Sequence, residues 1–275
     1  METINTESWA EFVQAIQDIR DKYGSYEIEG SDKPTNIDMY YRGQADESWS
    51  LDTTLERKTD KTYTVLSYAA LASLNSSEIE SFTGDSWNIP DYPDLEKEII
   101  KGCSSDPRLK LPIYDYLVYL RHHGFPSPLL DWSESPYIAA YFACIDAKDD
   151  ISPAVYCYIE TPNLSKRQAL GKPVIALQGK YVKTHKRHFS QKAWYTVAAI
   201  WDRNEKVYRF CHHENVFEEN NLKQDLLYKI VLPKNIRQEA LKVLNDYNIN
   251  HFTLFHSEDS LVKTIETKMF DLRDG

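Results

Sequence analysis

A run of polar side chains between two apolar segments, over residues 120–147, is the densest group of chemically active residues in this chain. Its members are His122, His123, Asp131, Ser133 and Ser135. Imidazole and carboxylate groups can transfer protons, and hydroxyl groups can contact a ligand or cap a helix. We therefore expect this stretch to form the floor of a site, with other segments supplying the walls.

Arg42 is the strongest candidate for gripping an anion, because it ends an expected strand over residues 37–43. A guanidinium group holds a phosphate or carboxylate through two parallel hydrogen bonds. Gly43 follows it, and a glycine lets a ligand approach the backbone closely. The structural alternative for Arg42 is an ion pair with Asp131, and the two roles are compatible.

The acid and the histidines also have structural interpretations. His122 and His123 end an expected helix and point to different faces, so at most one of them faces the site. The alternative role of such a histidine is to cap the helix or to pair with Asp131. Asp131 is expected to be buried, and a buried carboxylate needs a partner. It would orient Arg42 or His123, with general-base action as the other interpretation.

The two serines are equally open. Ser133 and Ser135 either contact a ligand or cap the helix that begins at Pro136, where proline suits the first helical position. Gln191 lies in a segment, residues 190–201, whose apolar and aromatic composition predicts a strand.

Three motifs together resemble the FRG domain family, named for its aromatic-Arg-Gly motif. They are Tyr41-Arg42-Gly43-Gln44; His122-His123-Gly124-Phe125-Pro126-Ser127 with Leu129-Leu130-Asp131-Trp132-Ser133, Ser135-Pro136 and Ala140-Tyr141-Phe142-Ala143; and Arg187 with Gln191, Ala193, Tyr195 and Thr196. The resemblance spans about residues 41–196. Departures are serine for the usual threonine at 127 and 133, Pro128 for a basic residue and Ala193 for glycine.

A weaker resemblance links the chain to the ADP-ribosyltransferase fold. That fold has Arg-Gly at a strand end, then a corner with a hydroxyl residue, then Glu or Gln on a later strand. Arg42-Gly43, Asp131-Trp132-Ser133 with Ser135, and Gln191 follow this order. The likeness implies that Arg42 grips the pyrophosphate or ribose of NAD, Ser133 orients the nicotinamide ribose and Gln191 holds a ribose hydroxyl. Glutamine in place of glutamate would weaken charge stabilisation and favour a base or nucleic-acid acceptor, or no catalysis.

These resemblances imply two sets of site residues. The catalytic set is Arg42, Ser133, Gln191, His123 and Asp131. The ligand-binding set is Tyr41, Gly43, Gln44, Trp132, Ser135, Tyr141, Arg187 and Tyr195.

The leading hypothesis is an NAD-dependent ADP-ribosyltransferase-like enzyme, such as a bacterial toxin or phage-defence effector, that modifies a protein or nucleic-acid target. It requires Arg42, Ser133 and Gln191 to share one cleft. The first alternative is a non-catalytic module that binds a nucleotide or phosphate-bearing ligand in the same pocket. The second is a nuclease or other hydrolase that uses His123 and Asp131.

Other catalytic patterns are missing from the sequence. His212-His213-Glu214 and His122-His123 could bind metal, but neither has the HExxH spacing, so we expect no metal. There is no GxSxG motif and no P-loop.

Composition narrows the partners. The net charge of −10 disfavours non-specific duplex binding, although residues 180–187 form one basic stretch that could draw in a nucleotide or RNA end. No apolar run is long enough to span a membrane, and the N-terminus lacks a secretory signal. The four cysteines form no CxxC pair, which is typical of free thiols in a reducing compartment. We therefore expect a cytoplasmic protein.

The periodicity of the chain predicts an α+β fold with an antiparallel-leaning sheet. The resemblance to the ADP-ribosyltransferase fold implies a mixed, split sheet with helices packed around it. We expect one domain over residues 1–275, with its core motifs at about 37–232. An amphipathic helix is expected over residues 8–23, a surface insertion at about 75–93, and a helical part over 234–272.

Overall fold

A computed structural model describes residues 1–26, 35–105, 109–162, 171–179, 182, 186–218 and 224–272. The strands are β1 (Glu2–Asn5), β2 (Ser25–Tyr26), β3 (Thr35–Asn36), β4 (Met39–Gln44), β5 (Leu130–Ser133), β6 (Ala154–Glu160), β7 (Pro173–Gln178), β8 (Ala193–Asp202), β9 (Val207–Phe210) and β10 (Asp225–Val231). The helices are α1 (Trp9–Tyr23), α2 (Thr54–Lys58), α3 (Val65–Ser73), α4 (Ser76–Thr83), α5 (Tyr92–Ser105), α6 (Tyr114–His122), α7 (Pro136–Cys144), α8 (Arg187–Ser190), α9 (His213–Glu218), α10 (Arg237–Asp246), α11 (His251–Phe255) and α12 (Glu258–Glu266), followed by the π-helix η1 (Thr267–Asp271).

One mixed sheet joins eight of the strands in the order β1-β10-β6-β4-β5-β8-β7, with β9 paired to β8. The edge strand β1 is parallel to β10, and every other pair in this sheet is antiparallel. The predicted α+β class with a mixed, antiparallel-leaning sheet is confirmed.

The sheet is narrowest between β4 and β5. These strands pair at one position, Tyr41 opposite Ser133, whereas β4 pairs with β6 over Met39 to Gln44 and β5 pairs with β8 along its whole length. The two parts of the sheet therefore meet at one paired position between β4 and β5.

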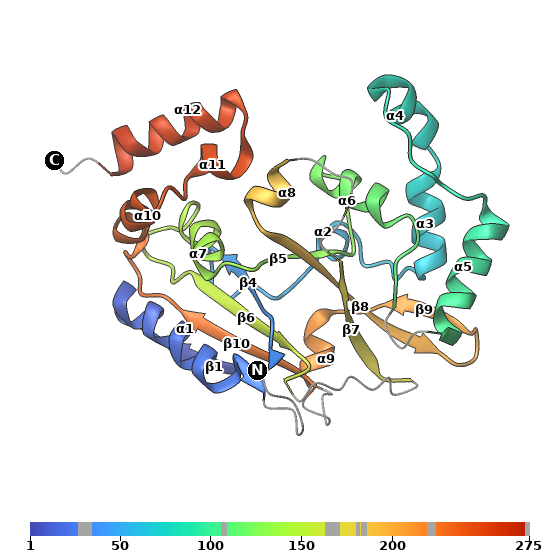
Figure 1. The fold of residues 1–275 in the computed structure, drawn as a ribbon, viewed down its shortest axis with the longest axis horizontal. Helices are drawn as coiled ribbons and strands as arrows, with labels where there is room; N and C mark the ends of the chain where they lie inside the picture. Colours follow the sequence, from blue (N-terminus) through green and yellow to red (C-terminus); the bar gives the residue numbers. More distant parts are fainter. Residues whose placement is uncertain are drawn as a thin grey trace.

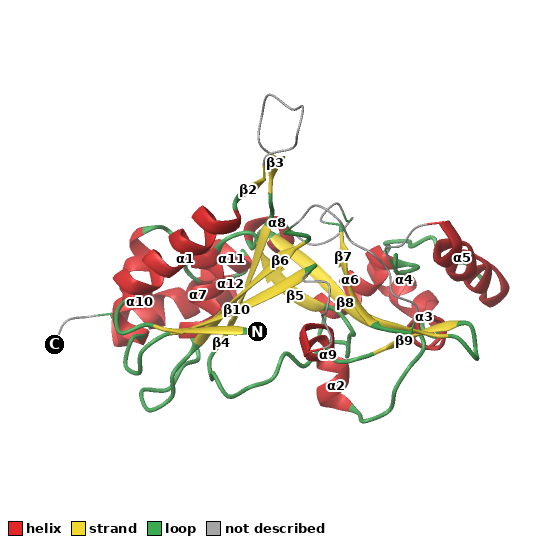
Figure 2. Cartoon of the chain, turned by 90° about the horizontal axis from the view of Figure 1, so that it is seen from below, coloured by secondary structure: helices red, strands yellow, loops and turns green. Residues whose placement is uncertain are grey.

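The helices on one face form two separate groups (Figure 1). The first group, α1, α7 and α10, packs on β4, β6 and β10 through a cluster that includes Phe12, Tyr41 and Ile230. The second, α3 and α6, packs on β7 and β8 through Tyr68 and Tyr195, among others. Because side chains alternate along a strand, the opposite face has its own cluster, which α9 covers (Figure 2).

Helix α7 lies unusually close to β4, and Gly43 explains why. A Cβ atom at Gly43 would lie 1.9 Å from the carbonyl oxygen of Ala139, so only glycine permits this contact. The helix begins at Pro136 and is capped by the Ser135 side chain, which accepts a hydrogen bond from the N–H of Ile138 at 3.4 Å. Backbone-to-backbone packing therefore fixes the position of α7 relative to β4.

Some boundaries differ from the sequence-based expectations. The expected surface insertion at residues 75–93 contains α4, and its Trp87 packs on Tyr119 of α6 with ring centroids 4.5 Å apart. The strand β1 was not predicted, and the helical part expected over residues 234–272 contains α10, α11, α12 and η1. Gln191 was expected in a strand but follows α8 as its C-terminal cap, because β8 begins only at Ala193 after a positive φ at Lys192.

Two expectations about the environment can be compared with the described residues. Cys144, Cys157 and Cys211 are free thiols, as predicted. Among the described residues, no helix is long and apolar enough to cross a membrane.

Candidate functional site

A pocket of about 490 Å³ lies between the two helix groups, above the narrow junction of β4 and β5. We call it the arginine pocket. Its walls are Tyr41, Arg42, Gly43, Thr54, Arg121, His122, Gly124, Phe125, Asp131, Trp132, Ser133, Ala139, Phe142, Arg187, Gln191, Ala193, Tyr195 and Phe255. Three arginines against one aspartate give these walls a formal charge of +2, so the pocket favours anions.

Asp131 is held by two arginines. Both oxygens of its carboxylate accept hydrogen bonds from the Nε and Nη2 groups of Arg121. The Nη1 group of Arg42 lies 3.9 Å from Asp131 Oδ2. Asp131 was expected to be buried, but its side chain keeps 45% of its exposure. Partial loss of water acts to raise the pKa of Asp131, but the two arginines outweigh it and keep that pKa below its usual range. Asp131 is therefore a carboxylate whose main role here is to hold Arg121.

Arg42 lines the arginine pocket and has one unused donor. Its Nη1 group donates to the carbonyl oxygen of Asp131 at 3.1 Å. Its Nε–H is buried, and no acceptor for it lies among the described residues. Burial lowers the pKa of Arg42 to about 10, which still leaves it charged at neutral pH. An anion in the pocket would supply the missing acceptor.

The third arginine belongs to a small network with His122 and Tyr195. Arg187 Nε donates to His122 Nδ1 at 2.9 Å, and His122 Nε2 lies 3.0 Å from the Tyr195 hydroxyl. Burial and the nearby Arg187 lower the pKa of His122 to about 3. His122 is therefore a neutral positioning residue at pH 7.

Ser133 and Gln191 line the pocket and also hold its far wall together. The Ser133 hydroxyl donates to the backbone carbonyl of Gln191 at 2.7 Å and accepts from the N–H of Ser135 at 3.1 Å. The Gln191 amide nitrogen donates to the carbonyl of Leu254 at 3.2 Å. These bonds connect β5 to α8 and α11, so both side chains have a structural role in addition to any contact with a ligand.

Three of the predicted ligand-binding residues, Gln44, Ser135 and Tyr141, lie outside the arginine pocket. His123, predicted as catalytic, is also outside: it is exposed and packs on Tyr119, with ring centroids 4.4 Å apart. Ser135 caps α7, and the Tyr141 hydroxyl contacts His251 Nδ1 at 3.1 Å on the other side of that helix. Gln44 donates to the carbonyl of Ser50 at 3.0 Å, at the edge of a neighbouring pocket.

The remaining predicted residues are at the pocket, although two have clear structural roles. Trp132 is buried and its indole N–H donates to the Thr196 hydroxyl at 2.8 Å. Gly43 lies at the pocket wall, but the space of its missing side chain is taken by α7 rather than by a ligand. Tyr41, Arg187 and Tyr195 line the pocket.

The neighbouring pocket, which we call the Arg57 pocket, measures about 600 Å³ and shares Arg42, Gly43 and Phe142 with the arginine pocket. Its other walls are Gln44, Ala45, Ser48, Trp49, Ser50, Asp52, Arg57 and Asp146. Arg42 lies at the boundary of both pockets, so a ligand longer than one ring system could reach from one into the other.

Arg121 is the main residue that sequence reasoning missed. It directly precedes His122 and His123, which the sequence analysis considered. Its position on the inner face of α6 would have identified it as a site residue. Phe255, by contrast, comes from α11, which no sequence signal connected with this pocket.

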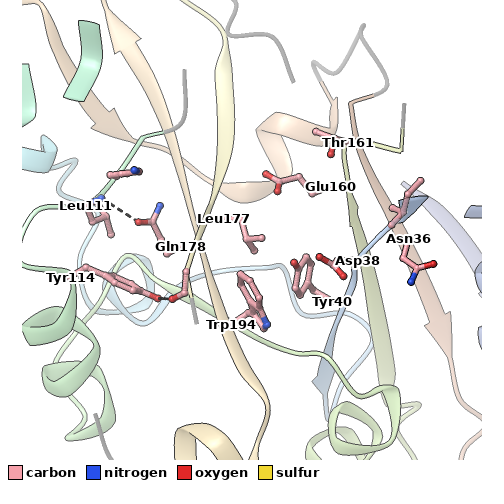
Figure 3. A pocket seen from close by; sticks show the side chains of 13 residues that line it. Asn36, Asp38, Tyr40, Leu111, Tyr114, Glu160, Thr161, Leu177, Gln178 and Trp194 are labelled. Carbon is pink, nitrogen blue, oxygen red and sulfur yellow. Dashed lines mark hydrogen bonds between the residues drawn. The ribbon is translucent and has the colours of Figure 1, made fainter. Parts of the chain in front are cut away.

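A third pocket, of about 610 Å³, contains none of the predicted site residues (Figure 3). We call it the acidic pocket. Its walls are Asn36, Ile37, Asp38, Tyr40, Lys110, Leu111, Tyr114, Glu160, Thr161, Leu177, Gln178, Gly179 and Trp194. Figure 3 shows Tyr40 beside Trp194, whose rings are 5.0 Å apart, with Asp38 next to them. Two carboxylates against one lysine make this pocket unsuited to an anion.

Of the basic stretch at 180–187, Lys180 and Lys183 lie outside the described residues, and Arg187 reaches the arginine pocket.

Comparison with known proteins gives one match. Residues 38–151 match the model of a protein family described as the FRG domain. The matched segment includes Arg42, Arg121 and Asp131 and ends before Arg187 and Gln191. No curated protein and no solved structure matches the chain.

Proposed function

This chain carries an FRG domain, and from that premise we propose that its arginine pocket binds a phosphate-bearing nucleotide, with NAD as the first candidate. The observation that carries the proposal is the excess of guanidinium groups over carboxylates in one pocket, together with the unpartnered Nε–H of Arg42. A buried donor without a partner costs about 1–3 kcal/mol, and a phosphate oxygen would satisfy it.

The shape of the walls supports a nucleotide rather than a small inorganic anion. Phe125, Phe142 and Phe255 line the arginine pocket, and the rings of Phe142 and Phe255 lie 6.1 Å apart. Aromatic rings stack on nucleobases and on nicotinamide. The cavity of about 490 Å³ is in the range of small-molecule sites, and the Arg57 pocket extends it.

Calorimetric titration of NAD into the purified chain tests this proposal. Arg42→Ala should weaken binding by about 10-fold or more, since a charge-assisted hydrogen bond contributes about 1.5–3 kcal/mol. Lys97→Ala is the matched control, because it also removes one positive charge but lies on α5, outside the arginine pocket. Equal affinities for both variants, or no binding of NAD by the unaltered chain, would rule out this ligand at this site.

A second candidate function is ADP-ribosyl transfer from NAD. The observation that favours it is that Arg42, Ser133 and Gln191 line the same pocket. In this reaction the bond from the ribose C1′ atom to the nicotinamide nitrogen breaks, and nicotinamide leaves with the electron pair. A nucleophile of the protein or nucleic-acid acceptor then bonds to C1′ and releases its proton to solvent. The part of this chain would be to position the ribose and to exclude water.

Release of nicotinamide separates this candidate from simple binding. Steady release in the presence of NAD, abolished by Arg42→Ala and by Gln191→Ala, would support transfer or NAD cleavage. Binding without release, with and without cell extract as a source of acceptor, would leave a non-catalytic module.

A toxin or phage-defence role in the bacterial cytoplasm would accompany transfer. Expression in bacteria should then arrest growth, and Arg42→Ala should restore it. Normal growth of cells that make the unaltered chain would contradict this role.

The hydrolase alternative has the least support. His123 lies outside the arginine pocket, and both oxygens of Asp131 are engaged by Arg121. A general base must reach the proton that it removes, and neither residue is placed for that.

A further inference from the structure

A group of side chains of the types that can coordinate a metal lies at the edge of the Arg57 pocket. Its members are Asp52, Glu56 and His212, whose ligand atoms all lie within 4.8 Å of one another. Asp52 lines the Arg57 pocket, Glu56 lies on α2, and His212 directly precedes α9. The chain thus brings two carboxylates and an imidazole together from positions more than 150 residues apart in the sequence.

The distances in this group suit a shared cation. His212 Nδ1 lies 3.4 Å from Asp52 Oδ1 and 3.3 Å from Glu56 Oε1. Ligand atoms about 2.1 Å from a tetrahedral zinc ion lie about 3.4 Å from one another. The two separations from His212 Nδ1 therefore match those of such a site, and the oxygens of Asp52 and Glu56 lie within 4.8 Å of each other.

An imidazolium ion paired with the carboxylates fits less well. Charge-assisted hydrogen bonds between nitrogen and oxygen are about 2.7–2.9 Å long, which is shorter than both observed distances. Nδ1 also carries at most one hydrogen, so it can donate to only one of the two carboxylates. A metal ion would contact all three groups at once.

The second oxygen of each carboxylate is fixed by a neighbour. Asp52 Oδ2 accepts from the Ser50 hydroxyl at 2.5 Å, and Glu56 Oε2 accepts from the backbone N–H of Thr53 at 2.6 Å. Outer contacts of this kind orient the ligands of metal sites and leave the remaining oxygen free to coordinate. The N–H of Leu51 donates to Glu214 Oε1 at 3.1 Å, which holds the His212 segment against the Asp52 segment.

We propose that Asp52, Glu56 and His212 bind a divalent transition-metal ion of the zinc class. One imidazole and two carboxylates are ligands that zinc accepts, and the exposed side of His212 leaves a coordination position for water or a ligand. The proposal replaces the sequence-based expectation of no metal, which relied on spacing within single motifs and could not see a site formed by distant segments.

Zinc titration of the chelator-treated full chain tests the proposal without any nucleotide. We expect one zinc ion per chain after desalting, measured by elemental analysis, and a higher melting temperature with zinc, because the ion binds the folded state. His212→Ala and Asp52→Asn should each weaken zinc binding at least 10-fold. His123→Ala is the matched control, since His123 is an exposed histidine outside this group.

Cobalt provides a second readout, because a bound cobalt ion with an imidazole and two carboxylates has visible absorption bands that free cobalt lacks. These bands should disappear in His212→Ala and persist in His123→Ala, while circular dichroism confirms that both variants fold. Less than one tenth of an ion per unaltered chain, or equal zinc binding by His212→Ala and His123→Ala, would overturn the proposal. Because NAD is absent, failure here leaves the arginine pocket untouched.

Discussion

The arginine pocket and the acidic pocket use neighbouring residues of the same two strands. Tyr41 of β4 and Tyr195 of β8 line the arginine pocket, whereas Tyr40 and Trp194, one position earlier on each strand, line the acidic pocket. Successive side chains of a strand point to opposite faces, so β4 and β8 each contribute one residue to the arginine pocket and the next residue to the acidic pocket. The pockets differ in charge, which comes from outside these strands as well as from Arg42.

Their surroundings account for this difference. Arg121 of α6 and Arg187 of α8 come from helices on one face, and they exceed the single carboxylate of Asp131. On the other side, Asp38 and Glu160 lie beside the ends of β4 and β6, against Lys110 alone. Ligand charge should therefore distinguish the two pockets, although their volumes are similar.

The largest expected effect on stability comes from a substitution in the wall of the arginine pocket, compared with a matched substitution in the acidic pocket. Gly43→Ala would place a Cβ atom 1.9 Å from the carbonyl oxygen of Ala139, so α7 must move away from β4. We expect the free energy of unfolding to fall by about 3 kcal/mol, measured by urea denaturation. Gly179→Ala is the matched control in the acidic pocket, where the added atom meets nothing within 4 Å. Similar losses in both variants would contradict this packing argument.

Removing Arg121 should have the next largest effect on stability. Arg121→Ala takes away both hydrogen bonds to the Asp131 carboxylate and leaves Arg42 as its nearby cation. Because the Asp131 side chain keeps 45% of its exposure, we expect a loss of about 1–2 kcal/mol rather than that of a fully buried pair. Asp38→Asn in the acidic pocket should change stability by less than about 0.5 kcal/mol. A reversed order of the two variants in urea denaturation would disprove the assignment.

Ligand charge sharpens the comparison further. ADP-ribose should bind at least about 10-fold more tightly than adenosine, because its phosphates reach the guanidinium groups. Raising the salt concentration should weaken the binding of ADP-ribose and leave that of adenosine almost unchanged. Equal affinities for both ligands in calorimetry would place the binding energy outside the arginines.

The effect that is smallest at neutral pH, and grows as the pH falls, is a dependence of stability on pH. The pKa of His122 is about 3 in the folded chain, below the ordinary value of 6.5, so the unfolded chain binds more protons between these values. The stability contribution of neutral His122 is complete above pH 6.5 and is lost as the pH falls towards 3. With His122→Gln, we expect the free energy of unfolding to fall less steeply as the pH decreases, by up to about 1 kcal/mol per pH unit. Urea denaturation from pH 7 to 4 measures this slope. An unchanged slope would contradict the burial of His122 as a neutral group.

Local patterns were sufficient to predict much of the fold. The amphipathic pattern over residues 8–23 located α1, and Ser135-Pro136 located the start of α7. The strand expected over residues 37–43 corresponds to β4, which spans Met39–Gln44. Such features depend on neighbours in the sequence, which periodicity and capping rules describe directly.

What the sequence could not supply depends on distant contacts. Gln191 was assigned to a strand because the apolar run begins beside it, but the turn at Lys192 separates it from β8. Arg121 and Phe255 reach the arginine pocket only because α6 and α11 converge there from different parts of the chain. The same limit hid the group of Asp52, Glu56 and His212. Likeness to the ADP-ribosyltransferases stays a prediction.

A crystal structure of the chain with ADP-ribose would test the central claim most directly. We predict that the phosphates lie against Arg42, with Arg121 or Arg187 nearby, and that the adenine or ribose contacts the phenylalanines of the arginine pocket. Density for ADP-ribose in the acidic pocket, or phosphates without any arginine contact, would contradict the account.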